Sequence, residues 1–398
     1  MIRHLWKLFW VRRRVNGMLL VEIALSFIVL FAVVYLALGS INRWNQPTGF
    51  DYHDKYVVNL DWMRSMEAGS ETSEEMLAVA VRMMREAKAV PGVLAVGAMD
   101  PTAYGISYSM TDLEYNGRTL NCEFSQADAG LKDVFNIQVT SGRWFEPSDD
   151  ALDWRPVVIS RQVAEELFGD EDPLGKIVNK TGTMRVVGVI DAFRVHGELA
   201  SLRPVFFIYL RSTPGKESTE PILSIVLDTD PDVPSNFEYN LQKRLQSVAP
   251  DWSITVNTME NMRASQMRLG LIPLIIVAIV SAFLLVMVVL GMVGVFWQAV
   301  ISRVEELGLR RAFGGTRTVV RWQILGEVIV LTLSGGLVAS LLIIQVPLLG
   351  IIPGMNFGSV IPALLLTMFF MTLLSLTSGI YPAWLASRIE PAEALHYE

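Results

Sequence analysis

The sequence has few of the residues that build covalent or metal cross-links. It contains one cysteine and four histidines in 398 residues. Cys122 alone cannot form an internal disulfide, and the histidines are scattered without the spacing of metal ligands. The motifs G-x-S-x-G, H-E-x-x-H and C-x-x-C are absent, which removes the usual signs of hydrolases, metalloproteases and thiol redox proteins. We therefore expect a chain that is not an enzyme and has no metal site.

One run superficially resembles a phosphate-binding loop. Two glycines, Gly169 and Gly175, are followed by Lys176 and Ile177. Five residues separate the glycines where such a loop has four, and Ile177 stands where a serine or threonine would hold magnesium. We expect no ATP site in this chain.

Charge is also scarce, because 18% of residues are charged and the mean hydropathy is +0.39. Four apolar stretches account for this, at 17–41, 269–300, 323–346 and 359–385. Each reaches the roughly 20 residues needed to span a bilayer. The first could be a signal peptide, but its apolar core is much longer than the roughly 7–15 residues of such peptides. The sequence predicts an α-helical membrane protein with four transmembrane helices.

The long block between the first two stretches, residues 42–268, is polar and acidic. It holds 22 lysines and arginines against 33 aspartates and glutamates, which argues against nucleic acid as a partner. Strand–helix–strand patterns occur twice, at 55–100 and 222–260, around a segment with more strand signal at 101–221. We expect a large α/β domain made of a βαβ subdomain and an inserted β-rich subdomain. Its clearest helix start is the capping-box pattern of Thr72 and Glu75.

Orientation follows from the short loops, since lysines and arginines near helix ends stay cytoplasmic. Residues 1–16 carry five basic residues and no acid, and form an amphipathic segment with tryptophans. The 301–322 loop is rich in arginine, whereas the 347–358 connection has no charge. Both termini, including the tail 386–398, are predicted to be cytoplasmic and the large domain external.

Two acidic residues fall inside the predicted helices, Glu22 and Glu327. Carboxylates at membrane depth are costly and often functional. Both lie near the cytoplasmic ends, so we interpret them first as structural groups that reach the surface or pair with an arginine.

The segment 303–327 combines charges of both signs with glycines. The second apolar stretch would rise ~45 Å at 1.5 Å per residue, beyond a hydrocarbon core of ~30 Å, and should project into the cytoplasm. Gly308 and Gly314 could then break it into short pieces that dock on a soluble protein. An ordinary positive-inside loop explains the same charges equally well.

The order of motifs in this chain resembles that of a known family. Glu306-Leu-Gly308-Leu-Arg310-Arg311-Ala-Phe-Gly314 is similar to the E-x-G-x-R-R-A-x-G signature of MacB/FtsX-like ABC transporter permeases, and Pro391–Leu395 is similar to their P-x-E-A-L ending. Gly142-Arg143-Trp-Phe145 and the stretch from Val157 to Val189 resemble the MacB-like periplasmic core domain. Phe313-Gly314-Gly315 departs mildly from the common Leu or Met followed by Gly-Ala.

The resemblance implies a permease subunit in an inner membrane that dimerises with a second copy or a paralogue. ATP and magnesium would be bound by a separate ABC-type ATPase, because only about 16 residues precede the first helix. The contact would be made by Glu305, Glu306, Gly308, Arg310, Arg311, Gly314 and Arg317. ATP binding would then move the periplasmic domain, which is mechanotransmission, for export or for handling lipoprotein or other hydrophobic cargo.

Two alternatives stay open. An FtsX-type regulator would use the same motion to activate a periplasmic cell-wall hydrolase. A membrane-anchored binding protein without energy input would leave the cytoplasmic signature unexplained. The sequence names neither the cargo nor any need for a periplasmic adaptor or an outer-membrane channel; membrane lipid is the remaining expected partner.

Overall fold

The chain forms two compact units, which we call the helical unit and the domain. The computed structural model describes residues 13–61, 72–179, 182–200, 202–211, 222–301, 316–352 and 354–386. The helical unit comprises residues up to Asn42 and from Pro273 onward, and the domain comprises Arg43–Ile272. The predicted 1–16 segment and the tail 386–398 lie almost entirely outside the described residues.

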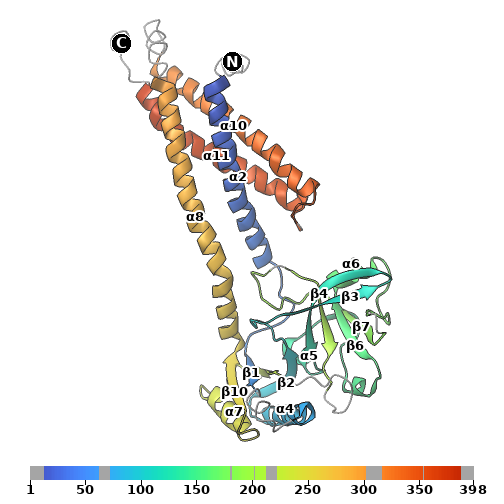
Figure 1. The fold of residues 1–398 in the computed structure, drawn as a ribbon. Coiled ribbons are helices and arrows are strands. Elements are labelled where there is room, and N and C mark those ends of the chain that lie inside the picture. The colour runs from blue at the N-terminus through green and yellow to red at the C-terminus, as the bar shows by residue number, and fades with distance from the viewer. Residues whose placement is uncertain are drawn as a thin grey trace. The chain divides into compact units, whose positions relative to one another are not determined.

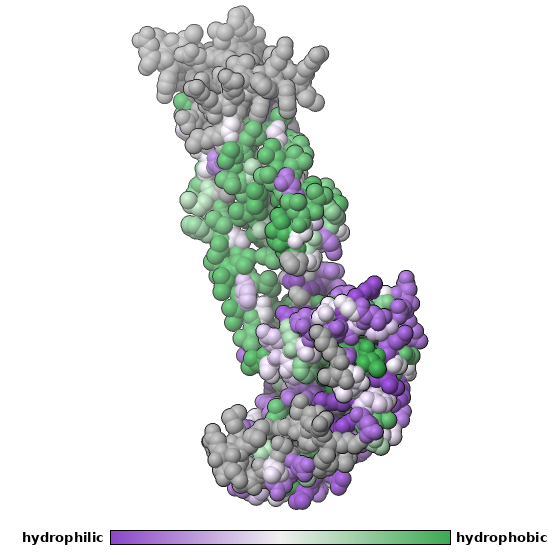
Figure 2. Space-filling model, turned by 45° about the vertical axis from the view of Figure 1, so that its right-hand side comes forward, coloured by the Kyte–Doolittle hydropathy of each residue, from purple (hydrophilic) through white to green (hydrophobic). Residues whose placement is uncertain are grey.

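Four long apolar helices are present, as predicted (Figure 1). They are α2 (Arg13–Trp44), α8 (Met259–Ile301), α10 (Arg317–Leu348) and α11 (Phe357–Ala386). Each has the length and hydropathy to cross a membrane. Figure 2 shows a mainly hydrophobic surface over these helices and a mainly hydrophilic one over the domain.

Helix α8 begins about ten residues earlier than its apolar pattern predicted. Its first residues include Glu260, Arg263 and Gln266, so hydropathy could not assign them to a spanning helix. They belong to the domain, which ends at Ile272. The expected boundary at residue 268 therefore falls inside a helix.

The helical unit has one core, to which α2, α10 and α11 contribute. Phe27 and Phe31 of α2, Ala339 of α10 and Ala363 of α11 are buried there. By contrast, α8 leaves large apolar side chains exposed, among them Ile279 at 65% and Phe283 at 63%. Burial of apolar surface is the main stabilising term in water, so this surface requires lipid or another protein.

The domain is built on a mixed ten-stranded sheet in the order β10-β1-β9-β2-β4-β8-β6-β7-β5, with β3 paired to β4. Its first part contains β1 (Lys55–Asp61), β2 (Val93–Asp100), β9 (Ser224–Thr229) and β10 (Ser253–Thr258). These four strands pair antiparallel in the order β10-β1-β9-β2. Helices α4 (Ser73–Lys88) and α7 (Phe237–Gln246) share a core with them, which makes two interleaved strand–helix–strand units.

The segment between β2 and β9 adds the rest of the sheet. It contains β3 (Ser109–Tyr115), β4 (Arg118–Ala127), β5 (Val139–Gly142), β6 (Arg155–Ser160), β7 (Met184–Ile190), β8 (Val205–Tyr209), α5 (Leu131–Phe135), the 3-10 turn η1 (Pro147–Ala151) and α6 (Arg161–Phe168). Pairs β4–β8 and β6–β7 are parallel. Only two residue pairs join β2 to β4, so the link between the two parts of the sheet is narrow.

Local signals account for the ends of the helices. The Thr72–Glu75 capping box is confirmed at α4, where Thr72 Oγ1 accepts from Glu75 N and Thr72 N donates to Glu75 Oε2. Helix α4 stops before Pro91-Gly92, and Gly92 has a φ of 91°, a conformation that glycine adopts at little cost.

Candidate functional site

The residues predicted to contact an ATPase fall in the sequence after the last residue of α8 and up to the first residue of α10. Only Arg317 is among the described residues; the other six lie outside them, namely Glu305, Glu306, Gly308, Arg310, Arg311 and Gly314. Arg317 is the first residue of α10 and is exposed. Thr316 caps the helix by accepting from Val319 N at 3.4 Å. A positive charge at a helix N-terminus interacts unfavourably with the helix dipole. The presence of an arginine at position 317 is therefore not explained by stabilisation of α10.

The two carboxylates that fall within the long apolar helices, Glu22 and Glu327, occupy different surroundings. A Cβ added at Gly291 of α8 would overlap Glu22 Oε1, so the Glu22 carboxylate lies against the α8 backbone. The pairing of Glu22 with an arginine stays a prediction, because most arginines near the same helix ends lie outside the described residues. Glu327 is half-buried on α10, next to the buried Val328.

Two adjacent glycines allow α10 to approach its neighbours closely. A Cβ at Gly335 would lie 2.6 Å from Ile23 Cγ2 of α2, and one at Gly336 would lie 2.7 Å from Met368 Cε of α11. Small residues at such contacts are typical of helix packing in membranes. Gly326, on the same helix, has no atom within 4 Å of the corresponding position.

Gly335→Leu is therefore expected to destabilise the helical unit by about 2 kcal/mol, the usual cost of overpacking. Thermal unfolding of the full chain in detergent measures this. Gly326→Leu is the matched control and should leave the unfolding midpoint nearly unchanged. Equal effects of the two substitutions would contradict close packing at Gly335.

A buried arginine ties together the segments of the domain that adjoin helix α2. Arg194 is 3% exposed. Its Nη1 donates to the carbonyls of Arg43 at 2.7 Å and Gln46 at 3.3 Å, and its Nη2 to those of Glu198 at 2.7 Å and Ala200 at 2.6 Å. Burial lowers the pKa of this guanidinium, although Glu198 acts in the opposite direction. Its planar fork holds the end of α2 to the 194–200 loop.

The same loop also holds the start of α8. Arg263 Nε donates to Glu198 Oε1 at 2.6 Å, and its guanidinium carbon lies 4.6 Å from the centre of the Tyr52 ring. Further along α8, Gln266 Nε2 donates to Gly105 O at 2.6 Å. We call the segments 43–54, 101–108, 191–200 and 259–270 the junction. The end of α2 and the start of α8 are thus bound to shared loops of the domain.

A half-buried aspartate, Asp128, lies at the narrow link between the two parts of the sheet. Asp128 Oδ1 accepts from Ala98 N at 2.9 Å and from Leu131 N at 3.0 Å. Trp144 Nε1 donates to Asp128 O at 3.1 Å. Burial raises the pKa of Asp128 to about 6, although the backbone hydrogen bonds act to lower it. Asp128 thereby connects β2, β4 and α5 at the place where two residue pairs join β2 to β4.

This pKa predicts a pH dependence of stability. A carboxyl whose pKa is higher in the folded state binds more protons there, so the free energy of unfolding falls as pH rises from about 4 to about 6. The loss amounts to about 3 kcal/mol at ~1.4 kcal/mol per pKa unit. Denaturant unfolding of fragment 43–272 should show it, and Asp128→Asn should flatten the profile. If the free energy of unfolding has the same pH dependence in the wild-type fragment and in Asp128→Asn, Asp128 is not the group responsible.

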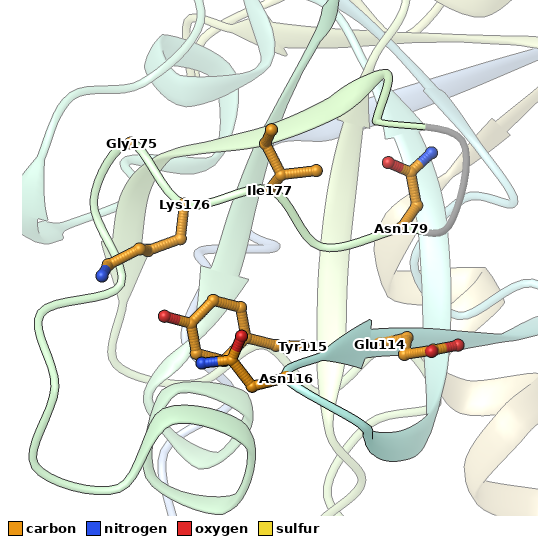
Figure 3. Close-up of a pocket in the computed structure, with 7 residues that line it drawn as sticks. All are labelled: Glu114, Tyr115, Asn116, Gly175, Lys176, Ile177 and Asn179. Atoms are coloured by element: carbon orange, nitrogen blue, oxygen red, sulfur yellow. The ribbon is translucent and has the colours of Figure 1, made fainter.

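The run that superficially resembles a phosphate loop lies beside a pocket of about 440 Å³ (Figure 3). Lys176 Nζ is 3.6 Å from Glu171 Oε2 and 5.8 Å from the centre of the Tyr115 ring. Tyr115 Oη donates to Glu171 Oε2 at 2.9 Å. Ile177 forms an isolated bridge with Arg185 instead of starting a helix, so the strand–loop–helix geometry of a phosphate loop is missing.

Sequence reasoning missed Arg194, Glu198 and Arg263, which folding brings together, and it also missed Asp128 at the link between the two parts of the sheet. No periodicity or motif marks them, because their partners are mostly backbone groups or residues distant in sequence. Within the described parts of the chain, His, Cys, Asp and Glu form no group of three or more that could hold a metal ion.

Comparisons with known proteins match both units. The model of the MacB-like periplasmic core domain matches residues 20–238, and that of the FtsX-like permease C-terminal region matches residues 278–391. The uncharacterized ABC transporter permease YknZ of Bacillus subtilis (strain 168) is 26% identical over 327 residues, which cover 78% of each chain.

Two longer relatives are named as ATP-binding/permease proteins. The macrolide export protein MacB of Bdellovibrio bacteriovorus is 30% identical over 275 residues, covering 65% of this chain and 41% of MacB. The pyoverdine export protein PvdT of Pseudomonas syringae pv. syringae is 24% identical over 408 residues, covering all of this chain and 59% of PvdT. The chain therefore spans less than two thirds of the length of either protein.

Proposed function

The chain belongs to the MacB/FtsX-like family of ABC transporter permeases, and on that premise we propose that it is the permease subunit through which a separate ATPase moves the external domain. The observation that carries this proposal is the order of the two family matches. The core-domain match ends at residue 238, and the permease match from residue 278 includes the 303–317 segment with its glycines and arginines.

The proposed motion starts at the cytoplasmic segment and reaches the domain through two helices. ATP binding displaces residues 303–317, where Arg310 and Arg311 meet acidic or carbonyl groups of the ATPase and Glu305 and Glu306 orient the segment. Helix α8 connects that segment to the domain, where Arg263 binds Glu198. Helix α2 ends at the carbonyls held by Arg194. A displacement of either helix therefore acts on the 194–200 loop.

The topology proposed is that of a multi-pass inner-membrane protein with cytoplasmic termini and a periplasmic domain, as the basic loops indicate. The exposed apolar side chains of α8 fit contact with lipid and with a second copy or paralogue. Since two relatives are named for export of a macrolide and of pyoverdine, we propose export or handling of a hydrophobic cargo. ATP and magnesium would be held by the ATPase, and this chain would catalyse no reaction itself.

The test is a mild-detergent pull-down of the full chain from native membranes, followed by mass spectrometry. Recovery of an ABC-type ATPase is expected. An additional adaptor, outer-membrane channel or bound hydrophobic molecule would support export. Recovery of a cell-wall hydrolase would instead support the alternative function, regulation of that hydrolase. Absence of any ATPase after cross-linking would contradict the proposal.

A further inference from the structure

A second pocket of the domain includes a residue from the end of α2. It is lined by Arg43, Ile106, Tyr108, His196, Leu199, Ala200 and Arg203, and its volume is about 460 Å³. All seven residues belong to the domain. Arg43 indicates the depth of this pocket relative to the membrane. It is the penultimate residue of α2, and the candidate membrane span of that helix is Leu20–Trp44.

The residues at that helix end are typical of the membrane–water interface. Trp44 is 47% exposed and follows Arg43 directly. Tryptophan side chains prefer the headgroup region of a bilayer. An arginine near the end of a spanning helix extends its guanidinium toward the headgroups, while its aliphatic carbons stay in apolar surroundings. The pocket is therefore expected at the level of the lipid headgroups on the external side.

The charge of the pocket is positive. Arg43 and Arg203 contribute guanidinium groups, and no carboxylate is among the described lining residues. The buried Glu123 carboxylate lies 2.9 Å from Nε2 of the lining residue His196. Among the described residues, the contacts of the Arg203 guanidinium are with weak acceptors, the Tyr108 ring at 5.8 Å and Met110 Sδ at 3.7 Å. A phosphate oxygen would be a much stronger acceptor for this guanidinium.

The rim of the pocket is apolar and exposed. Ile106 is 83% exposed and Tyr108 is 60% exposed, although isoleucine is among the residues most often buried. Nearby in sequence, Leu202 is 43% exposed. Apolar and aromatic side chains around basic ones form the pattern of surfaces that rest on a membrane.

We propose that this pocket binds the phosphate-bearing headgroup of an anionic phospholipid in the external leaflet. Ile106 and Tyr108 then enter the upper acyl region, and the base of the domain rests on the bilayer. A soluble acidic protein would match the charge, but it would not explain exposed Ile106 beside a helix that has just left the membrane. The proposal depends on the membrane placement of α2 and is independent of coupling to an ATPase.

The test uses the full chain with a polarity-sensitive fluorophore on Ile106→Cys. Cys122 is the sole native cysteine and is fully buried, so the label reports from position 106. The protein is reconstituted in nanodiscs of phosphatidylcholine with increasing phosphatidylglycerol. We expect a blue shift of emission and quenching by lipids that carry a quencher near the headgroup.

Arg203→Gln should raise the phosphatidylglycerol fraction at the half-maximal shift about fivefold, the contribution of one basic residue near an anionic membrane. Arg203→Lys keeps the charge and should stay within about twofold, which separates charge from folding. Arg82→Gln is the matched control, because Arg82 is an exposed arginine of α4, and it should have no effect. A label that stays in water in every bilayer, or one that responds equally in Arg203→Gln, would overturn the proposal, as would cross-linking of position 106 to an acidic protein without any lipid response.

Discussion

Reversal of two charges, Arg310→Glu with Arg311→Glu, is expected to reduce the affinity of the chain for its ATPase about 100-fold. Removing one partner of a buried interfacial charge pair costs about 2–5 kcal/mol, and each ~1.4 kcal/mol is tenfold in affinity. The ATPase recovered with the tagged chain, and the ATP hydrolysis of that eluate, should both fall to near background. Unfolding of the domain should not change, because the domain comprises Arg43–Ile272 and both substitutions fall outside that range.

A second disrupting variant and a control accompany this experiment. Gly308→Pro alters the backbone of the same segment without changing charge, and it should also uncouple hydrolysis. Arg82→Glu changes an exposed arginine of the domain by the same charge and should leave hydrolysis intact. Normal hydrolysis with both the Arg310/Arg311 reversal and Gly308→Pro would remove the coupling role of this segment.

Arg194→Met is expected to be the most damaging single change in the domain. It removes four hydrogen bonds from a charged donor and leaves carbonyls of Arg43, Gln46, Glu198 and Ala200 without that donor. Such bonds contribute about 1.5–3 kcal/mol each, and water can replace some of them. We expect a loss of about 4 kcal/mol in unfolding free energy of fragment 43–272.

The expected functional result separates the junction from the cytoplasmic contact. Full-length Arg194→Met should still recover the ATPase, but ATP should no longer change the conformation of the domain. Arg194→Lys keeps a charge without the planar fork and should be intermediate. Arg194→Met could instead have wild-type stability, or still allow ATP to change the conformation of the domain. Either result would contradict the proposal that the junction transmits the motion of α2 and α8 to the domain.

The four long apolar helices were predictable because runs of apolar residues mark them in the sequence. The start of α4 was predictable for a similar reason, since Thr72 and Glu75 satisfy each other within one turn. The start of α8 at Met259 was not, because its first turns are polar and fold as part of the domain.

The junction could not be predicted from sequence for a different reason. Arg194 binds main-chain carbonyls as far away as Arg43, and carbonyls carry no side-chain signature. Asp128 is likewise held by main-chain amides of β2 and α5. The proposed ATPase contact stays a prediction from the family resemblance, because all but Arg317 lie outside the described residues.

The central claim, that a partner ATPase moves the domain, is tested most directly by amide hydrogen exchange in the reconstituted complex. The amides to follow are those of Arg194 and Tyr104, which donate to Thr48 O at 2.9 Å and Val195 O at 2.7 Å. With a hydrolysis-deficient ATPase, ATP is predicted to change their exchange rates at least about tenfold, a change of ~1.4 kcal/mol in local opening. Unchanged exchange at both amides, while the ATPase itself shows ATP-dependent protection, would contradict the account.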